Sequence, residues 1–413
     1  MAQPLSKVYE GRTNYPFSAI WGQEKLKLAL LLNVINPQIG GALIRGERGS
    51  AKTIAVRGLS AILPEIEVVQ GCRFSCDPRD ISKMCSVCRE EYEKGVALPA
   101  ATRRMRIVEL PVGTTEDRVV GTLNIERAIT EGVKALEIGM LAEANRGILY
   151  VDNINLLDDH IMDVLLDSAA MGVNVVEREG VSVSHPAHFI LMGSMNPEEG
   201  ELRPQLHDRL AFHVEVKGVG SLQGRLKIMK QVIEFERDPL YFKGLYEESD
   251  REIAGKILKA QKFLPKVTID EDFLRIIARM CIELDVDGHR PDIIITRAAM
   301  TKAAYDERTK VSEDDMIFAS ELTLAFRMRR TPFEEAALGT ARFQQVLEHA
   351  KKLEAEEKMR KGKAKAKAKT KTKTETKAKT KTEAKTKTET KTKAETKAET
   401  ETKAYQSKSR AEK

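Results

Sequence analysis

The chain has 413 residues, of which 42% are hydrophobic, and a formal net charge of +6. It contains no run of eighteen apolar residues and no apolar stretch typical of a secretory signal near its start, so we expect a cytoplasmic protein without a membrane span. Residues 360–413 carry 20 Lys and Arg against 7 Glu, which leaves a net charge of −7 on residues 1–359. An acidic folded region argues against nucleic-acid binding.

The N-terminal elements lead into a glycine-rich turn. Residues 1–14 are polar and are predicted to be flexible, and residues 24–33 suit a mostly buried helix. Residues 41–45 are typical of a short buried strand, and residues 53–63 of a helix that leaves the turn.

The turn at residues 46–53 resembles the phosphate-binding pattern G-x-x-x-x-G-K-[ST], with Ala51 in place of the second glycine. A methyl group at this position is tolerable if the backbone of Ala51 stays at negative φ. The flanking strand and helix favour a phosphate site over a glycine-rich turn without a ligand. The expected nucleotide-binding residues are Gly46, Glu47, Arg48, Gly49, Ser50, Ala51, Lys52 and Thr53.

Short strands then alternate with helices. Strands are predicted at residues 66–69, 107–110, 147–152 and 189–196, with an amphipathic helix at 155–170 and a hairpin at 173–184 around Gly180. Asp152 and Asn196 end two of these strands. The alternation predicts a parallel α/β fold whose ligand lies at the carboxyl ends of the strands.

The second half of the sequence is helical. Helices are predicted at residues 222–236, 249–264, 270–284, 293–307 and 312–326. We therefore expect an α/β domain over residues 15–220, an all-helical domain over 221–332, a C-terminal helix over 333–360 and a disordered tail of Lys, Thr, Glu and Ala over 361–413. The tail suits a solubilising or expression-related segment, or a tether for an acidic partner.

Four cysteines lie in the segment 72–88, with the spacing C-x₃-C-x₈-C-x₂-C. Cys72, Cys76, Cys85 and Cys88 are spaced for a tetrahedral metal, most simply Zn²⁺, and an Fe–S cluster is the second choice. A redox-active thiol pair and unpaired thiols are the alternatives. Cys281 lies in an apolar helical stretch and is expected in the core.

Several strings resemble the small AAA+ ATPase subunit of magnesium chelatase over residues 15–332. They are ATRR (101–104), TTEDR (114–118), TEGVKA (130–135), ANRGILYVD (144–152), NLLDDH (155–160) and NPEEGELRPQL (196–206). The resemblance implies a P-loop NTPase with a helical lid, using ATP and Mg²⁺, in a homo-oligomeric ring, most simply a hexamer. It also implies two partners, a second AAA+ subunit with an integrin-like domain and a large porphyrin-binding subunit, and the insertion of Mg²⁺ into protoporphyrin IX.

The resemblance also implies roles for individual residues. Lys52 would neutralise phosphate charge, and Thr53 and Asp152 would hold Mg²⁺. Asn196 matches the first sensor, which contacts the attacking water or the γ-phosphate. Arg209 matches the arginine finger inserted into a neighbour, with Arg203 as a weaker candidate, and Arg290 matches the second sensor of the lid. A surface or interdomain ion pair is the alternative for each arginine.

The chain departs from the family at Asn153, where the family has a Glu that polarises the hydrolytic water. An amide holds water but cannot accept its proton, so slow hydrolysis is expected unless Glu143, Asp158 or Asp159 compensates. The alternatives to a magnesium-chelatase motor are a cobalt-chelatase motor of the cobalamin pathway, a non-hydrolysing ATP-binding scaffold and a AAA+ remodelling chaperone for another metalloprotein. A DNA motor is the least expected.

Overall fold

The computed structural model describes residues 13–123, 136–178, 181–324, 327, 345–357 and 359–360, and residues 386–388, 390–394, 396–398 and 400. The chain divides into two compact units, Met1–Val346 and Leu347–Lys413. The predictions for residues 1–12, for Gly180 and for most of the tail lie outside the described residues. None of the helices that the structure describes combines the length and apolar character needed to span a bilayer.

A five-stranded sheet with every pairing parallel forms the centre of the first unit. Its order is β11 (Phe212–Val216), β1 (Ala42–Gly46), β10 (Phe189–Met195), β7 (Gly147–Val151) and β4 (Ile107–Leu110). The side chains of β7 are buried throughout, as expected for a parallel strand covered on both faces. The predicted parallel α/β fold is confirmed.

Two strands differ from the sequence prediction. β11 was not predicted, although it pairs with β1 along the full length of that strand. β2 (Glu65–Val69) was predicted, but it pairs antiparallel with β3 (Ala100–Arg104) outside the main sheet. The other two-stranded sheets are β5 (Gly121–Leu123) with β6 (Leu136–Ile138), and the predicted hairpin of β8 (Val173–Arg178) with β9 (Val181–Pro186).

Helices and short 3₁₀ turns connect the strands. The α-helices are α1 (Glu24–Ile35), α2 (Lys52–Gly58), α3 (Ser86–Glu93), α4 (Glu116–Val120), α6 (Met140–Glu143), α7 (Asp159–Met171) and α8 (Pro204–Arg209). The helix predicted after the glycine-rich turn is confirmed as α2, which continues into a 3₁₀ turn, Leu59–Ala61.

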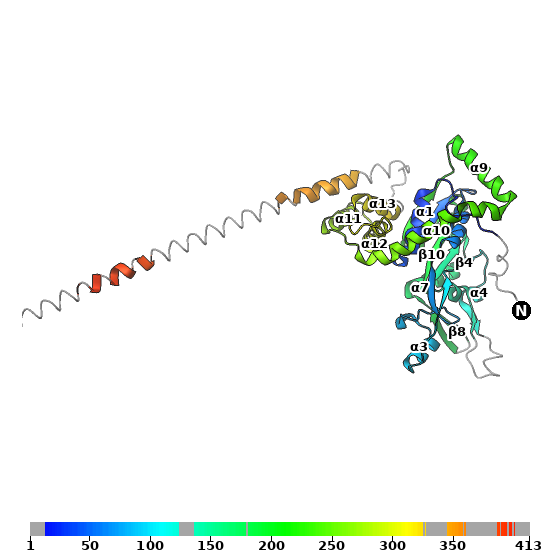
Figure 1. Cartoon of the computed structure of the whole chain (residues 1–413), viewed down its shortest axis with the longest axis horizontal. Coiled ribbons are helices and arrows are strands. Elements are labelled where there is room, and N and C mark those ends of the chain that lie inside the picture. Colours follow the sequence, from blue (N-terminus) through cyan, green and yellow to red (C-terminus); the bar gives the residue numbers. More distant parts are fainter. Residues whose placement is uncertain are drawn as a thin grey trace, which may run out of the picture. The chain divides into compact units, whose positions relative to one another are not determined.

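The second half of the first unit is helical, as predicted. It contains α9 (Leu222–Arg237), α10 (Pro239–Phe263), α11 (Glu271–Glu283), α12 (Arg290–Tyr305) and α13 (Glu313–Leu324), and the last three lie together in Figure 1. α10 begins ten residues before its predicted start, because the Asp238 side chain accepts a hydrogen bond from Tyr241 N (2.9 Å) and Pro239 occupies the first turn.

The predicted C-terminal helix and tail are described only in part. Residues 345–357 and 359–360 are helical, within the predicted helix 333–360. The described residues of the tail, between 386 and 400, also adopt helical turns. There, threonine hydroxyls donate to carbonyls four residues earlier, as Thr396 Oγ1 does to Thr392 O at 2.6 Å.

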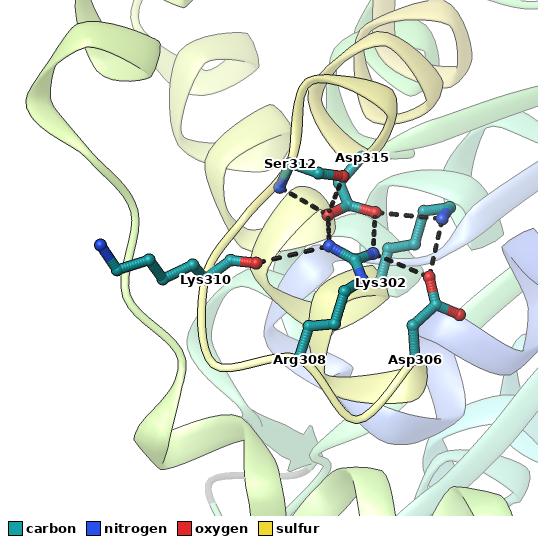
Figure 2. A network of polar contacts seen from close by, with 6 residues as sticks. All are labelled: Lys302, Asp306, Arg308, Lys310, Ser312 and Asp315. Atoms are coloured by element: carbon teal, nitrogen blue, oxygen red, sulfur yellow. Dashed lines mark hydrogen bonds and ion pairs between the residues drawn. The ribbon is translucent and has the colours of Figure 1, made fainter.

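A buried carboxylate joins α12 to α13 (Figure 2). Asp315 is fully buried and accepts both Arg308 guanidinium nitrogens at 2.7 Å, Lys302 Nζ at 3.0 Å, and Ser312 N and Oγ at 2.8 Å. Burial alone would raise the pKa of Asp315, but the hydrogen bonds from Arg308, Ser312 and Lys302 outweigh it and lower this pKa to about 2. The ion pair therefore fixes the loop between the two helices.

Asp315→Asn is expected to lower the free energy of unfolding by about 2–3 kcal/mol at pH 7, because Arg308 and Lys302 lose their buried charged acceptor and keep only the more exposed Asp306. The folded pKa lies below the ordinary value for an Asp, so the carboxylate stabilises the fold above pH 4 and loses this effect as the pH falls toward 2. Denaturant unfolding at pH 7 and pH 3 measures both effects. Asp314→Asn, at the exposed neighbour, is the control; equal losses in the two variants would contradict the prediction.

Candidate functional site

The predicted glycine-rich turn runs from the end of β1, an inner strand of the sheet, into α2. The buried Lys52 ammonium lies inside the turn and donates to Gly46 O (2.5 Å) and Glu47 O (2.8 Å). Burial lowers the pKa of Lys52, and the nearby Asp152 carboxylate opposes this shift. The turn thus has the strand–loop–helix context of a phosphate-binding loop, with its cation in place.

The backbone of Ala51 does not have the negative φ at which a methyl group is tolerable. Its φ is 64° and its ψ is 19°, in the left-handed region, whereas a methyl group was expected to be tolerable there only at negative φ. A side chain in this region approaches the following carbonyl and raises the energy of the backbone. The loop therefore keeps the glycine geometry of the pattern and carries strain at Ala51.

Ala51→Gly is expected to raise the free energy of unfolding by about 1 kcal/mol, because glycine adopts positive φ without a steric penalty. Gly49→Ala is the matched reciprocal change, since Gly49 has a φ of 76° and open space around it, and it should destabilise by about the same amount. Denaturant unfolding midpoints of both variants measure these effects. A less stable Ala51→Gly protein would show that residue 51 is not strained.

Asp152 follows β7 and faces the loop at the carboxyl edge of the sheet. Its Oδ2 lies 3.3 Å from Thr53 Oγ1, and its Oδ1 accepts hydrogen bonds from Tyr150 OH (3.0 Å) and from Ser194 Oγ. A hydroxyl and a carboxylate that face each other are the oxygen ligands that Mg²⁺ prefers beside phosphates. The predicted pair Thr53 and Asp152 is therefore brought together.

Sequence reasoning missed Tyr150 and Ser194. Tyr150 lies on β7 and Ser194 on β10, each two residues before a predicted site residue that directly follows the strand, and alternate residues of an extended chain share a face. This periodicity was the available signal. Both hydroxyls orient the carboxylate of Asp152.

The residue at the departure from the family, Asn153, also has a left-handed backbone, with φ at 54°. Its N–H donates to Ser194 Oγ (3.1 Å). Asparagine adopts this conformation more readily than most residues, so Asn153 fits its backbone conformation. Its side chain is an amide, which carries no charge.

Asn196, the predicted first sensor, is buried at the end of β10. Its Oδ1 accepts from Glu198 N (3.3 Å), whereas its Nδ2 has no hydrogen-bond partner in the part of the chain that the structure describes. A bound ligand or water molecule would satisfy such a buried amide. Glu199 nearby pairs with Arg48 of the loop, which ties this segment to the predicted phosphate-binding residues.

Arg290, the predicted second sensor, lies away from the glycine-rich turn of its own chain. Arg290 Nη2 donates to Arg209 O (3.0 Å), and it would lie 3.8 Å from a Cβ built on Gly40, which precedes β1. Gly46 is at the other end of that strand, roughly 13 Å away at the usual rise per residue. Arg290 therefore does not reach the loop of its own chain.

The side chains of Arg209 and Arg203 have partners within the chain. Arg209 Nη1 donates to Leu166 O in α7 (3.3 Å), and Arg203 pairs with Asp159. Asp159 was one of the acids expected to compensate for Asn153, but its carboxylate is paired with Arg203.

The four cysteines come together, as predicted. The Sγ atoms of Cys72, Cys76, Cys85 and Cys88 all lie within 4.8 Å of one another, and all but Cys72 are buried. α3 begins directly after Cys85 and carries Cys88. Cys281 is buried in α11, as expected.

Comparisons with known proteins agree with this architecture. Residues 122–220 match the family described as magnesium chelatase, subunit ChlI, and residues 274–348 match the AAA lid domain. The chain is 52% identical over 338 residues to the magnesium-chelatase subunit ChlI homolog of Methanocaldococcus jannaschii, covering 82% of this chain and 92% of the relative.

Two further proteins are similar. The chain is 50% identical over 329 residues to the magnesium-chelatase subunit ChlI of a Synechocystis species, covering 80% of this chain and 92% of the relative. A crystal structure of a putative ATPase from Cytophaga hutchinsonii has the same fold at 16% identity, with a TM-score of 0.52, covering 80% of this chain and 91% of that one. With its parallel α/β core, helical lid and glycine-rich loop, the chain belongs to the ChlI family of AAA+ magnesium-chelatase subunits.

Proposed function

We propose that this chain is the ATP-driven motor of a metal-chelatase complex, in which ATP hydrolysis here is coupled to Mg²⁺ insertion into protoporphyrin IX on a partner subunit. The observation that carries the proposal is the Thr53 hydroxyl facing the Asp152 carboxylate at 3.3 Å, directly beside the Lys52 ammonium. These are a cation and two oxygen ligands at the end of a helix, the set that a nucleotide triphosphate with Mg²⁺ requires.

Each residue of the site would act on a different part of the nucleotide. Lys52 would leave the carbonyls of Gly46 and Glu47 to neutralise the β- and γ-phosphates. Thr53 and Asp152 would hold Mg²⁺ directly or through water, and the metal would screen the phosphate charge. The unpartnered Nδ2 of Asn196 would donate to the γ-phosphate or to the attacking water.

The arginines support an assembly in which subunits share their sites. Arg290 lies near the start of β1 and the loop lies at the end of that strand, so Arg290 could assist only the nucleotide of a neighbouring chain. Arg209 adjoins it and is the proposed arginine finger. A head-to-tail ring brings this edge of one subunit to the loop edge of the next, which fits the proposed homo-oligomeric ring. The two proposed partners are a second AAA+ subunit with an integrin-like domain and a large porphyrin-binding subunit.

One observation favours a second function. Asn153 carries an amide at the position that would orient the hydrolytic water, and an amide cannot take a proton from it. Under this alternative the chain binds ATP as a scaffold of the ring, and a partner subunit performs the hydrolysis.

Reconstitution tests the main proposal. The chain, combined with the two partner subunits, protoporphyrin IX, Mg²⁺ and ATP, should produce Mg-protoporphyrin, followed by its fluorescence. Lys52→Ala should abolish the product, whereas Lys25→Ala, which removes an exposed lysine of α1, should leave it unchanged. Product formation without this chain, or without ATP, would contradict the proposal.

A further inference from the structure

The segment between β2 and β3 is a separate lobe, residues 70–99, with little apolar material of its own. It contains only one α-helix, α3, and the 3₁₀ turn Ile81–Lys83. Its fully buried residues are Cys76, Met84, Cys85 and Cys88, three of which are cysteines. Apolar side chains such as Val87 and Val96 are exposed. A segment of this size with so small a core needs a covalent or metal staple to hold one conformation.

The spacing of the sulfurs indicates which staple. Four thiolates around a single Zn²⁺ at 2.3 Å lie roughly 3.8 Å apart. Here all four Sγ atoms lie within 4.8 Å of one another, and the Cys72 and Cys85 Sγ atoms are 4.0 Å apart. In an iron–sulfur cluster the thiolates bind different irons and are spread more widely. A disulfide would use two sulfurs and leave two others without a role.

We propose that Cys72, Cys76, Cys85 and Cys88 bind one Zn²⁺ ion, which forms the core of the 70–99 lobe. The four ligands fill a tetrahedral shell, so the site is structural and leaves no open position for a substrate. Cys85 N donates to Cys76 Sγ at 3.1 Å, a contact that stabilises a thiolate ligand.

The Arg103 guanidinium, beside Arg146, which is itself paired with Asp77, partly offsets the negative charge that four thiolates and one Zn²⁺ would carry. Arg103 Nε donates to Ser75 Oγ (3.0 Å) and Arg146 Nη1 donates to Ser75 O (3.4 Å), so two guanidinium groups lie beside the segment that joins Cys72 to Cys76. Cations near the shell favour the thiolate form that binds metal.

The lobe is attached to the strand that delivers Asp152. Asn145 Nδ2 donates to Phe74 O (2.7 Å), and Arg146 Nη2 pairs with Asp77 (2.8 Å). Asn145 and Arg146 directly precede β7, which ends one residue before Asp152. The zinc would therefore fix the start of the strand whose other end forms the nucleotide site, without taking part in its chemistry.

The metal content of the full chain, purified under reducing conditions without chelator, tests the proposal. Mass spectrometry of the metals should find one zinc per chain, and Cys85→Ser and Cys88→Ser should each lower this content at least tenfold. Cys281→Ser removes the cysteine outside the cluster and should keep the zinc. A parent protein without zinc, or with iron and acid-labile sulfide, or with a disulfide among the four cysteines in reducing buffer, would overturn the assignment.

A second measurement keeps the test decisive if the serine variants fail to fold. Limited proteolysis of the parent chain, with and without a zinc chelator, should show new cuts within residues 70–99 only after chelation, and zinc addition should suppress them. Nucleotide binding, followed with a fluorescent ATP analogue, should persist in the chelated protein because Lys52 and Thr53 lie outside the lobe. Identical cleavage in the two samples would overturn the proposed role.

Discussion

Arg209→Ala is expected to lower ATP turnover by roughly 10³-fold while leaving ATP binding unchanged, because Arg209 is proposed to complete the site of the next subunit. Lys52→Ala should also abolish turnover, through loss of the cation inside the loop. At one interface, Lys52 belongs to the subunit that holds the nucleotide and Arg209 belongs to its neighbour. A site is functional when Lys52 of one subunit and Arg209 of its neighbour are both present.

Mixing the two inactive variants is the sharpest form of this test. In a ring with random exchange about a quarter of the interfaces pair an intact loop with an intact finger, so about a quarter of the parental turnover should return. The single variants, measured at the same total concentration with a nucleotide-binding control, give the baseline. If the mixture remains as inactive as its components, the arginine does not act between subunits.

Asn153→Glu is expected to raise the rate of ATP hydrolysis by roughly 10²–10⁴-fold, because it supplies the carboxylate that polarises the hydrolytic water. The backbone at residue 153 has a φ of 54°, which Glu tolerates less well than Asn, so a loss of about 1 kcal/mol in stability should accompany the gain. Single-turnover hydrolysis and denaturant unfolding measure the two effects separately.

Asn153→Gln is the matched control for this prediction. Gln has the size and the backbone strain of Glu without its charge, so it should lose stability and gain no rate. Asn153→Asp adds a carboxylate on a residue that tolerates positive φ. If the Asn153→Glu variant hydrolyses ATP no faster than the Asn153→Gln variant, the amide of Asn153 does not limit the rate of hydrolysis.

The sequence predicted the sheet and the loop because buried strands and glycine-rich turns have local signals. The strands at 107–110, 147–151 and 189–195 are mostly apolar, and Lys52 and Thr53 stand in a fixed pattern. β11 was missed although its residues, Phe212–Val216, alternate apolar side chains with His and Glu, a period of two that is typical of a strand. Its identity as a strand depends on pairing with β1, a long-range contact.

The parts of the site that could not be predicted depend on backbone conformation and on position in space. The positive φ of Ala51 follows from how the loop closes onto α2, not from the residue itself. The strand period places Tyr150 and Ser194 on the faces of Asp152 and Asn196, but the contact of Ser194 with Asp152 arises because β7 and β10 are neighbours in the sheet. Likewise, only the contacts of Arg290 with Arg209 O and near Gly40 show that it lies away from the loop of its own chain.

Steady-state ATP hydrolysis by the purified chain, beside Lys52→Ala and with nucleotide binding measured in parallel, tests the central claim most directly. The proposed motor should bind ATP and hydrolyse it, slowly because of Asn153, and Lys52→Ala should remove the hydrolysis. Binding without any turnover by the parent chain, or equal turnover by the parent and Lys52→Ala, would contradict the assignment of a motor to this site.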